Sequence, residues 1–228
     1  MIFIRRCAYL IVTCMLLSCN NNDKGNTSTQ DNKDKENVAE NTEPKRNILF
    51  FGNSLTAGYG LDDQQLAFPA LIQVKIDSLG LPYQCINAGL SGETSAGGNE
   101  RIDWLLKQPV DIFVLELGAN DGLRGISTES TYENLAKIVE KVRKAYPDCE
   151  LVLAGMMVPP SMGQTYFDEF KGIYPKLAKE YKMTLVPFLL DQVAGIEKLN
   201  QGDGIHPTEE GQKIVAENVW TVMEPLMK

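Results

Sequence analysis

Two segments of this 228-residue chain contain side chains that together could carry out nucleophilic catalysis. Ser54 follows a short apolar run and precedes a glycine-rich turn, and a serine held rigidly in such a position can act as a nucleophile. Asp203 lies three residues before His206, the one histidine of the sequence. A carboxylate can hold one imidazole nitrogen while the other nitrogen takes a proton from a serine hydroxyl. Ser54, His206 and Asp203 are therefore candidates for a nucleophile, its base and the group that orients the base.

Two further segments contain groups that could stabilise negative charge. Gly92 lies in a glycine-containing turn, where the backbone can approach a ligand closely and direct an N–H group towards it. Asn120 has a neutral amide donor suited to an oxyanion hole, where the loss of one donor lowers turnover by about 10²–10³. Each residue alone has a simpler interpretation: Ser54 as a helix cap, Asn120 as part of an Asn-Asp-Gly turn and His206 as a solvated loop residue. Only their combination indicates a catalytic site.

The elements expected to position these side chains alternate between strands and helices. Short apolar runs bounded by turn residues are typical of parallel strands covered on both faces, and they occur at residues 47–52, 83–88, 111–117, 150–156 and 183–188. Apolar residues with helical spacing occur at residues 131–145, 167–181 and 208–227. This alternation predicts an α/β protein with a three-layer α/β/α architecture and a five-stranded parallel sheet. Ligands of such sheets bind beyond the carboxyl ends of the strands, where the four segments lie.

Several classes of function are not supported. Hydrophobic residues make up 43% of the chain and charged residues 23%, which is typical of a globular protein and not of a disordered or multi-span membrane protein. The formal charge of −8 does not suggest a nucleic-acid partner. A single histidine excludes a zinc site built on a histidine cluster, and Asp121 alone makes no metal site. Tyr59 follows Gly58 where a phosphate-binding loop needs lysine, and no G-x-S-x-G motif is present.

The order of the four segments resembles the SGNH (GDSL-type) hydrolase family. The blocks are GNSL, GLSGET, GAND and DGIHP, and the resemblance extends over roughly residues 48–225. Within the family the chain is most similar to the periplasmic multifunctional acyl-CoA thioesterase, lysophospholipase and arylesterase group. The resemblance implies a flavodoxin-like fold, no metal, no cofactor and an acyl-serine intermediate. It implies that Ser54 is the nucleophile, His206 the base and Asp203 its orienting group, with an oxyanion hole formed by the backbone N–H groups of Ser54 and Gly92 and the Asn120 side chain.

The chain departs from the family pattern at Asn53, which stands where the first block has aspartate. An amide replaces some hydrogen bonds of a carboxylate but adds a donor where an acceptor is expected, so we expect activity to be retained. Two segments, residues 123–128 and 158–166, are expected to flank the acyl group as mobile loops. The residues predicted to bind substrate there are Leu123, Ile126, Pro160 and Met162.

The first 46 residues are expected to direct and attach the protein and not to fold with it. Residues 1–18 have basic residues followed by an apolar run too short to cross a bilayer, which predicts a signal peptide. The run ends in Leu-Leu-Ser-Cys, which resembles a bacterial lipobox, so Cys19 is the predicted lipidation site; the alternative is an ordinary signal peptide. Residues 19–46 are predicted to be a flexible polar tether and residues 47–228 the hydrolase domain. The predicted location is a bacterial membrane, periplasmic or at the cell surface.

The sequence therefore predicts a monomeric serine esterase or thioesterase that acts on small-molecule acyl esters such as lysophospholipids, acyl-CoA or aryl esters. One alternative is a carbohydrate or aryl O-acetylesterase of the same family. A second alternative, from another class, is a lipoprotein that binds lipid or glycan without catalysis. Cys85 and Cys149 lie in or beside predicted strands, where cysteines are more often buried and free; the sequence leaves open whether they pair.

Overall fold

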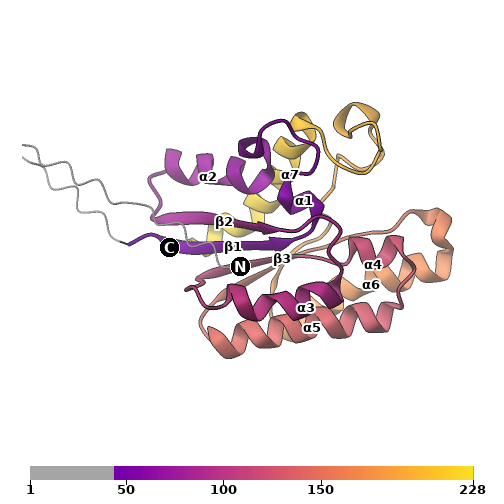
Figure 1. Cartoon of the computed structure of the whole chain (residues 1–228), viewed down its shortest axis with the longest axis horizontal. Coiled ribbons are helices and arrows are strands. Elements are labelled where there is room, and N and C mark those ends of the chain that lie inside the picture. Colours follow the sequence, from indigo (N-terminus) through magenta and orange to yellow (C-terminus); the bar gives the residue numbers. More distant parts are fainter. Residues whose placement is uncertain (1–43, 228) are drawn as a thin grey trace, which may run out of the picture. The chain divides into compact units, whose positions relative to one another are not determined.

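A computed structural model describes residues 44–227, which contain five strands, seven α-helices and four one-turn 3-10 helices (Figure 1). The strands are β1 (Arg46–Gly52), β2 (Tyr83–Gly89), β3 (Ile112–Glu116), β4 (Glu150–Ala154) and β5 (Thr184–Val186). The α-helices are α1 (Ser54–Ala57), α2 (Phe68–Ser78), α3 (Ser95–Leu105), α4 (Ala119–Leu123), α5 (Thr128–Ala145), α6 (Gln164–Tyr181) and α7 (Glu209–Met223). The 3-10 helices are η1 (Gln64–Leu66), η2 (Pro160–Met162), η3 (Glu197–Leu199) and η4 (Glu224–Leu226).

The strands form one parallel sheet in the order β2-β1-β3-β4-β5. Helices α1, α2 and α7 cover one face of the sheet, and α3, α4, α5 and α6 cover the other (Figure 1). The predicted three-layer α/β/α fold with five parallel strands is therefore confirmed. The order reverses at β1, and β1 and β3 are neighbours, so the loops that follow them meet at the edge where such sheets bind ligands.

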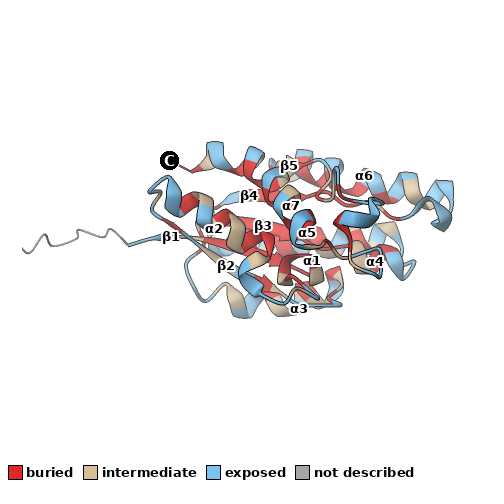
Figure 2. Ribbon diagram, turned by 90° about the horizontal axis from the view of Figure 1, so that it is seen from above, coloured by how far each residue is buried: buried red, intermediate tan, exposed pale blue. Residues whose placement is uncertain are grey.

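The core lies in the middle of the sheet, in β1 and β3 (Figure 2). Residues 48–51 of β1 and 112–115 of β3 are buried at every position. Because helices cover both faces of these strands, side chains pointing to either face are removed from water, and both sets have to be apolar. This explains why the strands appear in the sequence as continuous apolar runs.

The long helices bury most of the apolar faces that their spacing predicts, with differences in α6, where Tyr181 is only partly buried, and in α7. In α5 the predicted stripe is fully buried, and its first turn is capped by the Ser127 side chain, which accepts from the Ser130 N–H group at 3.1 Å. In the last predicted helix, residues 208–227, the spacing predicts an apolar face; its members Val215, Val219 and Met223 are buried, whereas Ile214, Val222 and Leu226 are only partly buried. This helix packs against both α2 and β5, and its buried face includes Gln212, whose side-chain oxygen accepts from the Phe68 N–H group of α2 at 3.0 Å.

Several boundaries differ from the predicted ones. The strand β1 begins at Arg46, one residue inside the predicted tether, and the Arg46 Nε atom lies 3.2 Å from an Asp111 carboxylate oxygen. The strands β4 and β5 end earlier than predicted, at Ala154 and Val186, and the Gly155 N–H group just beyond β4 still donates to Val186 O at 2.8 Å. Cys85 and Cys149 are both free.

The predicted signal peptide, Cys19 and nearly all of the predicted tether lie outside the described residues. Within residues 44–227, no helix combines the length and the apolar character that crossing a bilayer requires.

Candidate active site

The predicted nucleophile is the first residue of α1, directly beyond the carboxyl end of β1. The Asn53 side-chain oxygen accepts from the Leu55 N–H group at 3.0 Å, which caps this four-residue helix. The helix ends at Gly58 in a left-handed conformation, so the chain turns back immediately. Ser54 is half-buried, between the buried strand and the exposed turn, and its Oγ atom lies 3.4 Å from Asn53 Oδ1.

The predicted base and its carboxylate lie together in the loop between η3 and α7. One Asp203 oxygen accepts from the N–H groups of Ile205 and His206 at 2.9 and 3.0 Å, which folds the loop into a tight turn. The other Asp203 oxygen lies 2.6 Å from His206 Nδ1, and His206 Nε2 lies 2.9 Å from Ser54 Oγ. The structure thus brings three residues from the two ends of the domain into one hydrogen-bonded chain.

The protonation of this chain follows from the contacts of the carboxylate. The hydrogen bonds from the His206 side chain and from two backbone N–H groups lower the pKa of Asp203 to about 2. Asp203 is therefore ionised at neutral pH, and its carboxylate can accept a hydrogen bond from a protonated Nδ1 of His206. In the tautomer that carries its proton on Nδ1, the lone pair of His206 Nε2 faces Ser54, which is the arrangement that allows it to take the hydroxyl proton.

The two predicted oxyanion segments lie beside this turn. The Leu90 N–H group donates to Gly52 O at 2.9 Å and so joins the loop after β2 to the end of β1. Gly92 has a φ of +81°, a conformation that glycine adopts without strain. The Asn120 side-chain nitrogen donates to Glu93 O at 3.0 Å, and Arg124 donates to Gly92 O at 3.0 Å. These bonds hold α4 against the loop that contains Gly92 and leave one amide hydrogen of Asn120 available.

The residues predicted to bind substrate lie on two segments that contact each other. Leu123 is exposed at the end of α4, and Pro160 and Met162 are exposed in η2. The Tyr166 hydroxyl group donates to Ile126 O at 2.7 Å and connects the segment after α4 with the first turn of α6. The structure therefore places these four residues on neighbouring segments, and within residues 44–227 none of them forms a hydrogen bond with Ser54 or His206.

A buried carboxylate beneath the nucleophile was not predicted from the sequence. Glu116, the last residue of β3, is 1% exposed and accepts three hydrogen bonds from the nucleophile turn. The donors are the Asn53 N–H group at 3.0 Å, the Asn53 side-chain amide at 2.7 Å and the Thr56 hydroxyl group at 2.8 Å. A Cβ atom on Gly52 would lie 2.5 Å from a Glu116 oxygen, so the turn closes around this carboxylate only with glycine there.

This contact also explains the asparagine at position 53. Its amide group donates to Glu116, a bond that an aspartate could make only if one of the two carboxyl groups were protonated. With asparagine the turn keeps both its cap, through Asn53 Oδ1, and a hydrogen-bond donor to Glu116, through the side-chain amide. The asparagine that departs from the expected aspartate at position 53 thus forms a hydrogen bond with Glu116 that uses its amide group.

Burial gives Glu116 an effect on stability that depends on pH. Loss of water raises the pKa of Glu116 from 4.5 to about 7, against the opposing hydrogen bonds from Thr56 and Asn53. The native state then binds more protons than the unfolded state between these values, so the free energy of unfolding falls as pH rises through this window, by up to about 3 kcal/mol. We expect Glu116→Gln to remove this decrease when the free energy of unfolding, measured by urea unfolding, is plotted against pH from 4 to 9. The same pH dependence in the variant and the wild-type protein would contradict the prediction.

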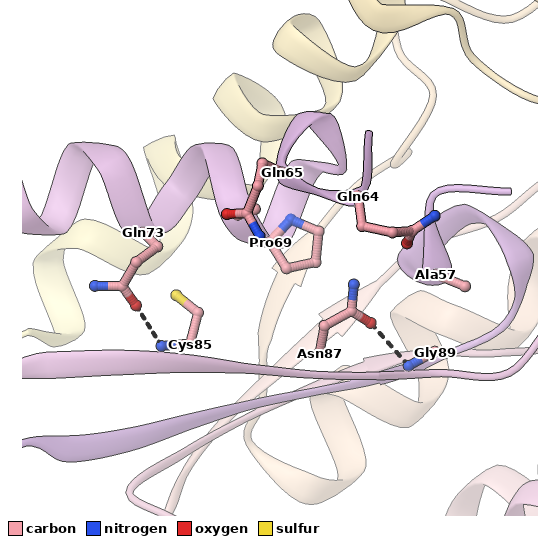
Figure 3. Close-up of a pocket in the computed structure, with 9 residues that line it drawn as sticks. Ala57, Gln64, Gln65, Pro69, Gln73, Cys85, Asn87 and Gly89 are labelled. Carbon is pink, nitrogen blue, oxygen red and sulfur yellow. Dashed lines mark hydrogen bonds between the residues drawn. The ribbon is translucent and has the colours of Figure 1, made fainter. Parts of the chain in front are cut away.

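A cavity of about 420 Å³ lies between α2 and β2, and none of the predicted catalytic residues lines it (Figure 3). Amide side chains, among them Gln64, Gln73 and Asn87, line it. Gln73 accepts from the Cys85 N–H group at 2.6 Å and donates to Tyr83 O at 3.3 Å, so it occupies hydrogen-bonding positions of the free edge of β2. Burial raises the pKa of the Cys85 thiol to about 12, so this cysteine is not a nucleophile at neutral pH.

A second hollow, of about 540 Å³, lies beside the predicted oxyanion segment and is lined by residues 90–94 together with Gly97, Glu100 and Arg101. Among residues 44–227, no group of three or more histidine, cysteine, aspartate or glutamate side chains is arranged to hold a metal ion.

Comparison with known proteins identifies the family. Residues 50–214, more than half of the chain, match the model of the GDSL-like Lipase/Acylhydrolase family. The chain belongs to this family. It is an esterase whose substrates are small-molecule esters.

Relatives of this esterase agree with the assignment. It is 39% identical to Esterase TesA of Pseudomonas aeruginosa over 181 residues, which are 79% of this chain and 89% of the relative. It is 38% identical to Thioesterase 1/protease 1/lysophospholipase L1 of Escherichia coli K12 over the same length, 84% of that protein. A crystal structure of TesA superimposes with a TM-score of 0.76 at 38% identity and covers 79% of this chain and 99% of the other.

Proposed function

We propose that this esterase cleaves carboxylic esters and thioesters through an acyl-serine intermediate on Ser54. The observation that carries the proposal is the hydrogen-bonded chain from Asp203 through His206 to Ser54. The Ser54 oxygen attacks the carbonyl carbon while His206 Nε2 takes its proton, and the carboxylate of Asp203 stabilises the imidazolium. His206 then gives this proton to the leaving oxygen or sulfur, and a water molecule repeats the sequence to release the acid.

In this proposal the negative charge of the tetrahedral intermediate is stabilised by three donors. They are the backbone N–H groups of Ser54 and Gly92 and the free amide hydrogen of Asn120. The support is that hydrogen bonds through Glu93 and Arg124 fix Asn120 and Gly92 on adjoining loops. Donors that are already oriented need no reorganisation when charge develops, which makes them effective.

The proposed substrates are esters and thioesters of medium to long acyl chains, lysophospholipids and acyl-CoA among them. Leu123 and Met162 support this, because they are exposed apolar side chains on the two segments joined by Tyr166. An acyl chain that covers such side chains gains about 0.8 kcal/mol for each methylene group removed from water. The names of the two curated relatives, a TesA esterase and a thioesterase and lysophospholipase, point in the same direction.

The test is the rate of hydrolysis of p-nitrophenyl esters from acetyl to palmitoyl by the full chain. We expect kcat/KM to rise with chain length up to a maximum beyond acetyl. Leu123→Ala should lower the value for the long esters by about 3- to 10-fold and leave acetyl ester hydrolysis nearly unchanged, since only long chains reach this side chain. Leu79→Ala, an exposed leucine after α2, is the matched control. A preference for the acetyl ester would instead indicate an O-acetylesterase, and no hydrolysis of any ester would indicate a binding protein.

We further propose that the protein is an exported lipoprotein that acts as a monomer, held to a membrane through Cys19. The lipobox-like sequence at residues 16–19 supports the anchor, and Ser54, His206 and Asp203 all come from one chain, which supports a monomer. We expect the wild-type protein in the membrane fraction of cells and Cys19→Ser in the soluble fraction. Equal distribution of the two proteins would exclude the lipid anchor.

A further inference from the structure

Tyr59 presents an exposed aromatic ring directly beside the proposed base. It follows Gly58, which ends α1, and it is 53% exposed. Its ring centroid lies 4.7 Å from that of His206, with 45° between the two ring planes. This separation is within the range of favourable contacts between aromatic rings. Tyr59 therefore borders the imidazole while most of its ring remains available to another molecule.

Hydrogen bonds fix Tyr59 to both halves of the site. Its N–H group donates to Ser54 O at 3.0 Å, and its carbonyl oxygen accepts from the Gln201 side chain at 2.7 Å. The same Gln201 nitrogen donates to Pro207 O at 3.0 Å, and the Gln201 N–H group donates to His206 O at 2.7 Å. The backbone at Tyr59 is thus tied to the nucleophile turn and, through Gln201, to both sides of the base. On this fixed backbone the ring rests against the His206 ring, which reduces the freedom that it loses when it binds a ligand.

The chemistry of the reaction decides which part of the substrate lies next to this ring. The leaving oxygen or sulfur has to come within hydrogen-bond reach of His206 Nε2 to receive its proton. The group attached to that atom therefore lies beside the imidazole, where Tyr59 is exposed. The acyl chain is bound elsewhere in the proposed function, near Leu123. An aromatic leaving group can stack on Tyr59, whereas an aliphatic one gains only the burial of its surface.

We propose that Tyr59 is a specificity-determining residue that binds aromatic leaving groups, so that the enzyme favours aryl esters over alkyl esters with leaving groups of similar acidity. This inference rests on the proposed function. No additional bond changes are involved: the aryl–oxygen product accepts the proton of His206 and leaves as a phenol.

The test compares phenyl butanoate with hexafluoroisopropyl butanoate, which share an acyl group and have leaving groups of comparable acidity. Hydrolysis by the full chain is followed by titration of the released acid, so that both substrates are measured in the same way. We expect Tyr59→Leu to lower the ratio of kcat/KM for the phenyl ester to that for the fluoroalkyl ester by about 2- to 10-fold. Tyr59→Phe keeps the ring and should restore the ratio. Trp104→Leu, which removes a 68% exposed aromatic side chain of α3, is the control.

Each other outcome has a definite meaning. An equal loss for both esters in Tyr59→Leu would overturn the proposal and leave Tyr59 as a residue that only positions His206. An unchanged ratio with unchanged rates would overturn it as well. A failure of the proposed function itself is distinguishable, because Ser54→Ala would then hydrolyse both esters as fast as the wild-type protein.

Discussion

The Ser54→Ala protein is expected to hydrolyse p-nitrophenyl butanoate with a kcat about 10⁶-fold below that of the wild-type enzyme. The reason is that Ser54 Oγ is the oxygen that lies 2.9 Å from His206 Nε2, so without it the acyl-enzyme cannot form. The residual rate reflects only stabilisation of the transition state for attack by water, which an intact oxyanion hole still provides. The measurement is the steady-state rate at high enzyme concentration, with the variant purified free of wild-type protein.

Two further variants test whether the loss of activity is due to the Ser54 hydroxyl group itself. Ser78→Ala removes an exposed hydroxyl group at the end of α2 and should keep the full rate, since this hydroxyl bonds only to Lys75 O among its described contacts. The double variant Ser54→Ala with His206→Ala should lose little more than Ser54→Ala alone, because the residues of such a chain act as a unit. A Ser54→Ala protein that keeps a large share of the wild-type rate would show that the nucleophile is another group.

Asp203→Asn is expected to lower kcat by about 10⁴-fold while leaving the fold intact. Asparagine can still accept from the N–H groups of Ile205 and His206 through its oxygen, so the turn is kept. Its NH₂ group, however, then faces His206 Nδ1 and favours the tautomer that carries its proton on Nε2. This tautomer cannot take a proton from Ser54, and the imidazolium also loses the negative charge beside it.

The loss should be measured as kcat from pH 5 to 9, together with the urea unfolding midpoint. Asp148→Asn, which neutralises an exposed carboxylate after α5, is the matched control and should behave like the wild-type enzyme. A decrease of only a few-fold in Asp203→Asn would mean that another group orients His206, and the proposed role of Asp203 would be wrong.

The fold was predictable where burial leaves a strong pattern in the sequence. The central strands are buried on both faces, so each appears as an apolar run, and the stripe of α5 is buried along its whole length. Helix α3 was not located in advance, because it contains Gly97 and Gly98 and has little apolar periodicity. Gly98 is there because a Cβ atom would overlap with Leu117, a requirement of packing that the local sequence does not express.

The types of residue at the site were predictable, but the contacts that support them were not. Ser54, Asp203 and His206 are recognisable by chemistry and spacing, and the structure joins them by hydrogen bonds. Glu116 appears in the sequence only as a charged residue at the end of an apolar run. Its role depends on hydrogen-bond donors about 60 positions away in the chain. The contact between the rings of Tyr59 and His206 likewise joins residues that are far apart in the sequence. Only the fold brings such partners together.

The most direct test of the account is covalent labelling with a fluorophosphonate, followed by peptide mapping by mass spectrometry. The probe phosphonylates a serine that an adjacent base has activated, independently of which ester is the natural substrate. The account predicts one adduct per chain, on the peptide that contains Ser54, with no adduct in Ser54→Ala and much slower labelling in His206→Ala. An adduct on a different residue, or no adduct on the folded wild-type protein, would contradict it.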